Sequence, residues 1–79
     1  MRTTHLSDFE ASRHATFCAA TKGLSAWRIA QACNRLRHGL DWRGCTKTHM
    51  AEAFAAGDLA AYSGEELRAA VAAEARRHD

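Results

Sequence analysis

Proline is absent from this 79-residue chain, and valine and isoleucine occur once each. Without proline the chain lacks the residue that breaks helices most strongly, and the scarcity of valine and isoleucine disfavours strands. Alanine, which has the highest helix propensity, is abundant instead. The composition therefore predicts an all-α protein.

Long apolar runs are also lacking. No segment approaches the roughly 20 apolar residues that span a bilayer, and the start, with Arg2, His5, Asp8 and Glu10, is unlike the apolar stretch of a signal peptide. We therefore expect no membrane association and a cytoplasmic location. A chain of this length has room for one helical domain, 1–79, with one modest core.

The chain has three cysteines, and an odd number cannot form a closed disulfide framework. Cys18 and Cys33 fall where small core residues are expected. Cys45 lies in a predicted loop between Arg43 and Lys47, and neighbouring cations favour the thiolate. Cys45 is therefore the candidate for an intermolecular disulfide, with an ordinary free thiol as the alternative.

Capping signals divide the chain into four helices. Ser7 with Glu10 has the pattern of a capping box and predicts a helix over 8–21. Ser25 predicts a second helix over 26–38, which Gly39 stops. Thr46 or Thr48 predicts the start of a third helix that ends at 56. Asp58 predicts one short helical turn that reaches Tyr62. The capping box of Ser63 and Glu66 predicts a last helix that ends at about 77.

Apolar side chains recur within these segments at helical spacing and predict the core. The predicted core comprises Phe9, Phe17, Trp27, Ile29, Ala30, Cys33, Leu36 or Arg37, Leu40, Met50, Phe54, Leu59, Leu67, Ala70, Val71 and Ala75. Glu74 falls at the edge of the last apolar stripe. Trp42 lies in the predicted loop, where a second copy could cover it, so a homodimer is an open alternative.

The charges are sorted along the chain, although the net charge is only +2. Residues 22–49 contain six cations and one anion, whereas residues 50–75 contain five anions and one cation. We expect one positive and one negative lobe, a field that can attract and orient a charged macromolecule.

The basic segment contains the sharpest local pattern. Arg28, Gln31, Arg35 and His38 recur in steps of three and four, which places them on one face of a helix. Guanidinium and amide groups can contact phosphates and base edges, whereas a solvated helix face explains the same pattern without a partner. The candidate nucleic-acid-binding residues are Arg28, Gln31, Arg35, Arg37, Arg43 and Lys47.

The acidic segment offers a second candidate surface, for a protein partner. Its residues are Glu52, Asp58, Tyr62, Glu65 and Glu66. Spaced carboxylates can pair with the arginines and lysines of a nucleic-acid-binding groove, and tyrosine is a frequent interface anchor. Glu65 and Glu66 can equally serve to complement a helix N-terminus.

Motifs for chemistry are missing. His14 with Cys18 and Cys45 with His49 are each one turn apart, but neither has the short C-x2-C spacing typical of zinc, so we expect no metal ion. The chain has no nucleophile elbow, phosphate-binding glycine loop or paired carboxylates. We therefore expect no enzymatic activity and no cofactor.

In its small size, single domain and polarised charge, the whole chain resembles the anti-CRISPR proteins, the phage-encoded inhibitors, and in particular those that act on type I surveillance complexes. The resemblance implies a stoichiometric inhibitor in the host cytosol that binds a nucleic-acid-binding effector subunit and prevents target DNA binding. The acidic residues would then imitate DNA phosphates. The alternative function is a small DNA-binding transcriptional regulator that uses the basic second helix.

Overall fold

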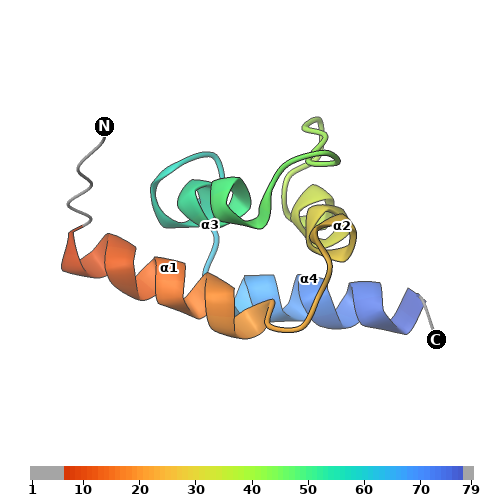
Figure 1. The fold of residues 1–79 in the computed structure, drawn as a ribbon, viewed down its shortest axis with the longest axis horizontal. Coiled ribbons are helices and arrows are strands. Elements are labelled where there is room, and N and C mark those ends of the chain that lie inside the picture. The colour runs from red at the N-terminus through yellow and green to blue at the C-terminus, as the bar shows by residue number, and fades with distance from the viewer. Residues whose placement is uncertain (1–6, 78–79) are drawn as a thin grey trace.

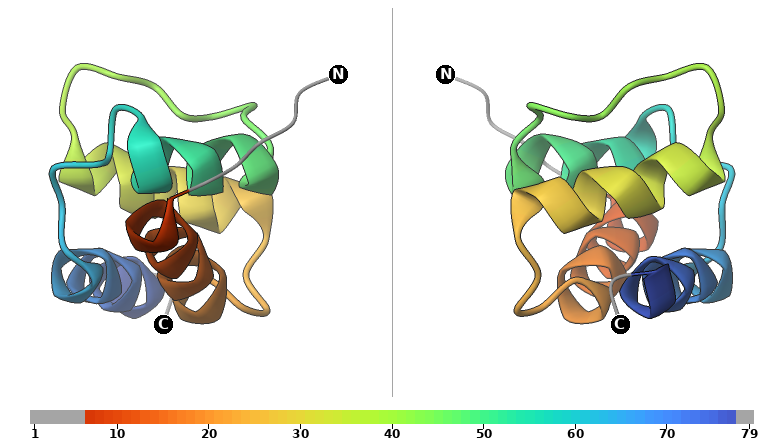
Figure 2. Two further views of the ribbon diagram at one scale, coloured as in Figure 1. Left: turned by 90° about the vertical axis from the view of Figure 1, so that its left-hand side faces the viewer. Right: turned by 90° about the vertical axis from the view of Figure 1, so that its right-hand side faces the viewer.

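The computed structural model describes residues 7–77, which form four α-helices and no strand. The prediction of an all-α fold is confirmed. In one layer lie α1 (Asp8–Ala20) and α4 (Gly64–Arg77), and α2 (Ala26–Leu36) and α3 (Lys47–Ala56) form a second layer that crosses the first (Figures 1 and 2). Between the layers, α1 packs mainly against α3, and α2 mainly against α4.

Both predicted capping boxes are formed. The Ser7 hydroxyl accepts a hydrogen bond from the Glu10 N–H, and the Glu10 carboxylate accepts one from the Ser7 N–H, each at 3.1 Å. Ser63 and Glu66 make the same reciprocal pair at 3.1 and 3.0 Å. These bonds satisfy backbone donors that the first turn of a helix leaves unpaired. The starts of α1 and α4 are therefore set by residues adjacent in the sequence.

Helix α2 is shorter than predicted, because it ends at Leu36 rather than at 38. Ser25 caps its start as expected, but Arg37 already has an extended backbone, with φ −133° and ψ 104°. Gly39, at φ +92°, then adopts the left-handed conformation that glycine tolerates best. Gly39 is therefore part of the loop that follows, and His38 lies beyond the helix whose face it was predicted to share.

Thr46 caps α3, and the turn predicted after that helix is present. The Ala60 N–H donates to the Gly57 carbonyl at 3.0 Å, and the Tyr62 N–H donates to the Leu59 carbonyl at 3.1 Å. These two successive turns bury Leu59 completely. Such burial contributes roughly 1.5–3 kcal/mol for a side chain of this size.

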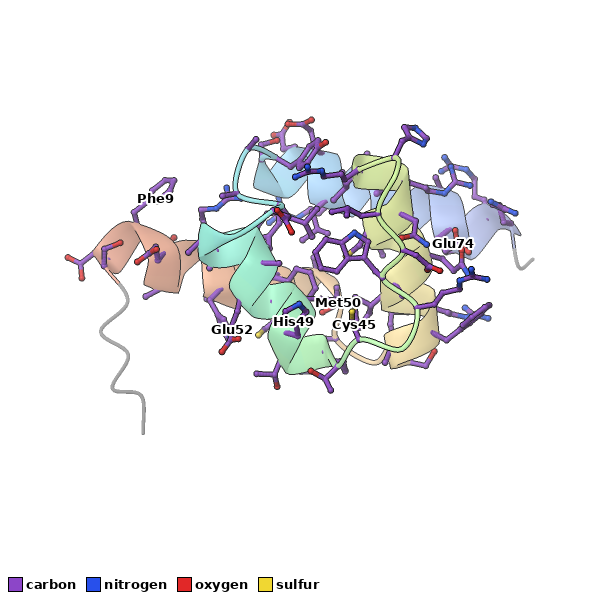
Figure 3. The ribbon with its side chains drawn as sticks, turned by 90° about the horizontal axis from the view of Figure 1, so that it is seen from above. Phe9, Cys45, His49, Met50, Glu52 and Glu74 are labelled. Carbon is purple, nitrogen blue, oxygen red and sulfur yellow. The ribbon has the colours of Figure 1, made fainter. Side chains whose placement is uncertain are left out.

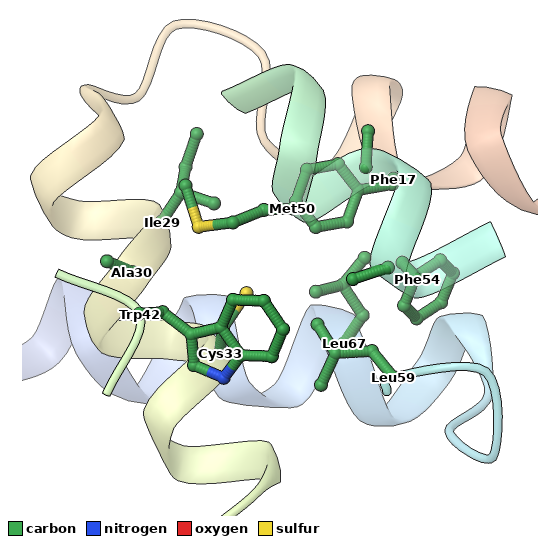
Figure 4. Close-up of a cluster of buried hydrophobic side chains, with 11 residues drawn as sticks. Phe17, Ile29, Ala30, Cys33, Trp42, Met50, Phe54, Leu59 and Leu67 are labelled. Atoms are coloured by element: carbon green, nitrogen blue, oxygen red, sulfur yellow. The ribbon is translucent and has the colours of Figure 1, made fainter. Parts of the chain in front are cut away.

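The core lies between the two layers (Figure 4). Phe17 from α1 and Phe54 from α3 pack with their ring centroids 5.7 Å apart. Ile29, Cys33, Met50, Leu59 and Leu67 complete the buried centre with neighbouring alanines. The alanines let the helices approach closely, so a short chain can enclose these few large side chains.

Three aromatic residues lie where the sequence does not predict them. Trp27 and Phe9 were expected in the core, but their side chains are 54% and 69% exposed. Trp42 was expected at the surface and is only 4% exposed. The backbone N–H of Trp42 donates to the Asn34 side-chain oxygen at 3.0 Å, and this bond fixes the loop over the core. Trp42 therefore needs no second copy of the chain to cover it.

Arg13 joins α1 to the end of α3. Its guanidinium donates to the carbonyl oxygens of Phe54, at 2.9 Å, and Leu59, at 3.1 Å. The same group lies 4.1 Å from the centroid of the Phe54 ring, within the range of a cation–π interaction. The Arg13 side chain thus satisfies one carbonyl at the end of α3 and one in the turn that follows, and it packs on the Phe54 ring.

Candidate functional site

The outer side of α2 carries four residues, Trp27, Arg28, Gln31 and Arg35, which we call the α2 face. Helical spacing brings them together, because Gln31 lies one turn after Trp27 and Arg35 one turn after Gln31. Ile29 and Cys33, on the opposite side of the helix, are fully buried. The exposed indole is therefore surrounded by cationic and amide groups.

Most of the α2 face is free of internal partners. The side chains of Arg28 and Gln31 make no hydrogen bond or ion pair with any of residues 7–77. Arg35 is different, because its Nε donates to Glu74 Oε2 of α4 at 3.2 Å. The Glu74 side chain is only 6% exposed and the Arg35 side chain 35% exposed. Arg35 thus anchors α2 to α4 through its Nε, and its two terminal nitrogens make no hydrogen bond within residues 7–77.

A polar hollow of about 350 Å³ adjoins the α2 face. It is lined by Gln31, Asn34, His38, Gly39, Leu40, Asp41 and Arg43. The hydrogen bond from the backbone N–H of Trp42 to Asn34 fixes the loop beside the helix. The loop thereby makes α2 one wall of a shallow depression.

Arg43 contributes less free charge than the sequence indicates. Its Nε and Nη2 bond the Asp41 carboxylate, with distances of 2.7–3.1 Å, and its backbone N–H bonds the same group at 3.0 Å. Hydrogen bonds from the Arg43 side chain and backbone lower the pKa of Asp41 from 3.8 to about 2, and the carboxylate in turn raises the pKa of Arg43. The pair is an exposed, charge-compensated unit at the edge of the hollow.

The two remaining predicted cations lie away from the α2 face. The Arg37 Nη1 is 3.4 Å from Asp58 Oδ1, and Lys47 lines a separate hollow of about 200 Å³ with His14, Cys18 and Phe17. Of the six predicted nucleic-acid-binding residues, the structure therefore brings together Arg28, Gln31 and Arg35, with Arg43 across the hollow.

Two of the predicted acidic residues already serve the fold. Glu66 belongs to the cap of α4, and Asp58 pairs with Arg37. Tyr62 is half-buried and packs against the core. With the bond between Arg35 and Glu74, two ion pairs link the basic segment to the acidic segment. The predicted separation into two lobes is therefore incomplete.

The other two acidic residues lie at different hollows. Glu52 and Asp58 line one hollow of about 280 Å³ beside α3. Glu65 lines another with Arg13 and Arg68, so its carboxylate has cations nearby. The acidic residues thus form two patches rather than one surface.

Two residues of this region were missed by the sequence analysis. Trp27 was assigned to the core, although its four-residue step to Gln31 indicates the α2 face. Glu74 was placed only at the edge of the apolar stripe, yet it is buried beside Arg35. No local signal identifies the partner of Glu74, because 39 residues separate it from Arg35.

The three thiols differ in exposure. Cys18 is exposed, contrary to its predicted core position, and its Sγ lies 3.7 Å from His14 Nδ1. Cys33 is buried as predicted; burial, with a smaller effect of Cys45, raises its pKa from 9.0 to about 12. Cys45 is partly buried. Within residues 7–77, no three histidine, cysteine or carboxylate side chains are grouped so that they could hold a metal ion.

Comparisons with protein-family models, with curated proteins and with solved structures find no match to this chain. None of the described helices has both the length and the apolar character needed to cross a membrane. The functional argument therefore depends on the exposed groups themselves.

Proposed function

We propose that this protein is a nucleic-acid-binding protein that contacts its partner through the α2 face. The observation that carries the proposal is the exposed indole of Trp27 beside two side chains, Arg28 and Gln31, that have no partner within residues 7–77. A guanidinium can bind phosphate, an amide can bind base edges, and an indole can stack on a base.

Charge supports the same assignment. The α2 face contains two arginines, and its one close carboxylate, Glu74, is buried beneath it. The nearest exposed carboxylate around the hollow, Asp41, is compensated by Arg43. The surface therefore presents a net positive charge to an approaching polyanion, which favours its encounter with nucleic acid.

The salt dependence of DNA binding tests this proposal. We expect the affinity of the wild-type protein for DNA to fall steeply as the salt concentration rises. Arg28→Ala should make the slope of log K against log salt less steep by about 0.9 if one phosphate contact on a duplex is lost, or by about 0.7 on a single strand. Arg68→Ala is the matched control, because Arg68 is an exposed arginine of α4 and lies outside the α2 face. Equal effects of the two substitutions, or no DNA binding by the wild-type protein, would contradict the proposal.

The second candidate function is the one that the anti-CRISPR resemblance implies, inhibition of a type I effector complex. The observation that favours it is that Glu52 and Asp58 line one hollow and present carboxylates together. These groups could pair with cations of a DNA-binding groove and exclude DNA.

Capture of target DNA by a purified type I surveillance complex, measured with and without this protein, tests the inhibitor. Glu52→Lys should relieve a stoichiometric block, whereas Arg28→Ala should leave it intact. No block by the wild-type protein would eliminate this candidate.

A further inference from the structure

The position of Trp27 distinguishes between forms of nucleic acid. The chain has two tryptophans, of which Trp42 is buried in the core and Trp27 is more than half exposed. An exposed indole offers a flat aromatic surface on which a base can stack. In an intact duplex the bases already stack on one another, so such a contact requires an unpaired base.

The surroundings of α2 also disfavour duplex recognition. A helix that reads the major groove must project far enough to enter it. Here the loop beside Gln31 and Asn34 forms the second wall of a hollow, and α4 packs along the side of the helix that carries Arg35. The α2 face is therefore set in a shallow surface that can hold a flexible strand better than it can enter a groove.

The face is long enough for a short strand. Trp27 and Arg35 are eight residues apart, which corresponds to about 12 Å along the helix at a rise of 1.5 Å per residue. The hollow extends this surface to His38 and Arg43. Arg28 and the two terminal nitrogens of Arg35 are available for phosphates along that path, because only the Nε of Arg35 is bonded to Glu74.

We propose that the α2 face binds single-stranded DNA, with one unpaired base stacked on Trp27 and adjacent phosphates held by Arg28 and Arg35. This inference rests on the proposed function and narrows it to one class of ligand. The contacts are to base faces and phosphates, and none of them requires a ribose hydroxyl, so DNA is the occupant to which we commit.

The full chain can be tested with a fluorescently labelled oligothymidylate, a DNA duplex of equal length and the matching oligouridylate. By fluorescence anisotropy at low salt, we expect the oligothymidylate to bind at least as tightly as the RNA and roughly tenfold more tightly than the duplex. Trp27→Ala should weaken binding of the oligothymidylate by roughly tenfold, the effect typical of one lost stacked base. Trp27→Phe should retain part of the affinity because a smaller aromatic ring remains.

Phe9→Ala is the matched control. Phe9 is also an exposed aromatic residue, but it lies on α1, toward the opposite end of the molecule from Glu74 and the α2 face (Figure 3). We expect this substitution to change the affinity for the oligothymidylate less than twofold. Circular dichroism of each variant verifies that the helices are retained.

The outcomes separate the inference from the function on which it rests. Duplex binding equal to or tighter than single-strand binding would overturn the single-strand assignment and leave nucleic-acid binding in place. Tighter binding to the oligouridylate would overturn the choice of DNA. Equal losses in Trp27→Ala and Phe9→Ala would overturn the role of Trp27. The absence of binding to all three probes would overturn both proposals.

Discussion

The basic and acidic segments have similar numbers of charges, but the fold uses them differently. In the basic segment, the Arg28 side chain has no hydrogen-bond or ion-pair partner among residues 7–77 and lies beside an exposed tryptophan. In the acidic segment, Glu66 caps a helix, Asp58 pairs with Arg37, and Glu74 is buried beside Arg35. Charge sorting along a sequence therefore says where ions occur but not which of them are available to a partner.

The difference has a simple physical origin. Helix N-termini favour carboxylates, so Glu65 and Glu66 at the start of α4 stabilise the helix whether or not a partner exists. The packing of α2 against α4 then brings Arg35 to Glu74, and the turn after α3 brings Asp58 to Arg37. What remains exposed and unpaired after these requirements are met is the better indicator of a binding surface.

The largest expected effect concerns the buried link between the two regions. Arg35→Met should lower the free energy of unfolding by about 3 kcal/mol, because it removes the guanidinium that bonds the buried Glu74 carboxylate. Urea denaturation measures this loss. Arg28→Met, on the same helix, should cost less than about 0.5 kcal/mol because Arg28 is exposed. Equal costs would mean that both arginines have the same role.

The capping box at the start of α4 provides a smaller effect. Ser63→Ala should lower the free energy of unfolding by about 1 kcal/mol, since it removes the acceptor of the Glu66 N–H. Glu65→Gln, in the same turn, should cost only about 0.3 kcal/mol, because an exposed carboxylate gains little from the helix dipole or from the nearby cations Arg13 and Arg68. Thermal unfolding of both variants compares them. A larger loss from Glu65→Gln would show that Glu65 has a structural role beyond that of a free surface carboxylate.

The smallest effect is expected at the exposed pair of Arg37 and Asp58, whose side chains are 44% and 60% exposed. A double-mutant cycle with Arg37→Ala and Asp58→Ala should give a coupling energy of about 0.5 kcal/mol, which salt should reduce. A coupling as large as the cost of Arg35→Met would place this surface pair in the same class as the buried one.

The sequence predicts the helices well because their starts are encoded locally. Ser7, Ser25, Thr46 and Ser63 each bond a backbone N–H three residues ahead, so a short stretch of sequence is sufficient to find them. The end of α2 is less predictable, because the loop that begins at Arg37 is fixed by Asn34 and Trp42 rather than by a glycine.

Only part of the candidate site can be predicted from the sequence, because some of its features depend on residues distant in the sequence. The spacing of Arg28, Gln31 and Arg35 identifies one helix face, and the structure retains it. The burial of Trp42 in place of Trp27 depends on a loop that folds across the core, and apolar spacing within a single helix carries no information about that loop. The partners of Arg35 and Arg37 likewise lie 39 and 21 residues away.

Arg13 fastens α1 to the end of α3 through groups that are not carboxylates. Its guanidinium contacts two backbone carbonyls and the Phe54 ring. The ties of α2 to α4 and to the turn after α3 instead each include a carboxylate, from Glu74 or Asp58. Amide hydrogen exchange of a Glu74→Gln, Asp58→Asn double variant should therefore find α2 loosened while α1 stays as protected as before, so that the protein opens from a defined side.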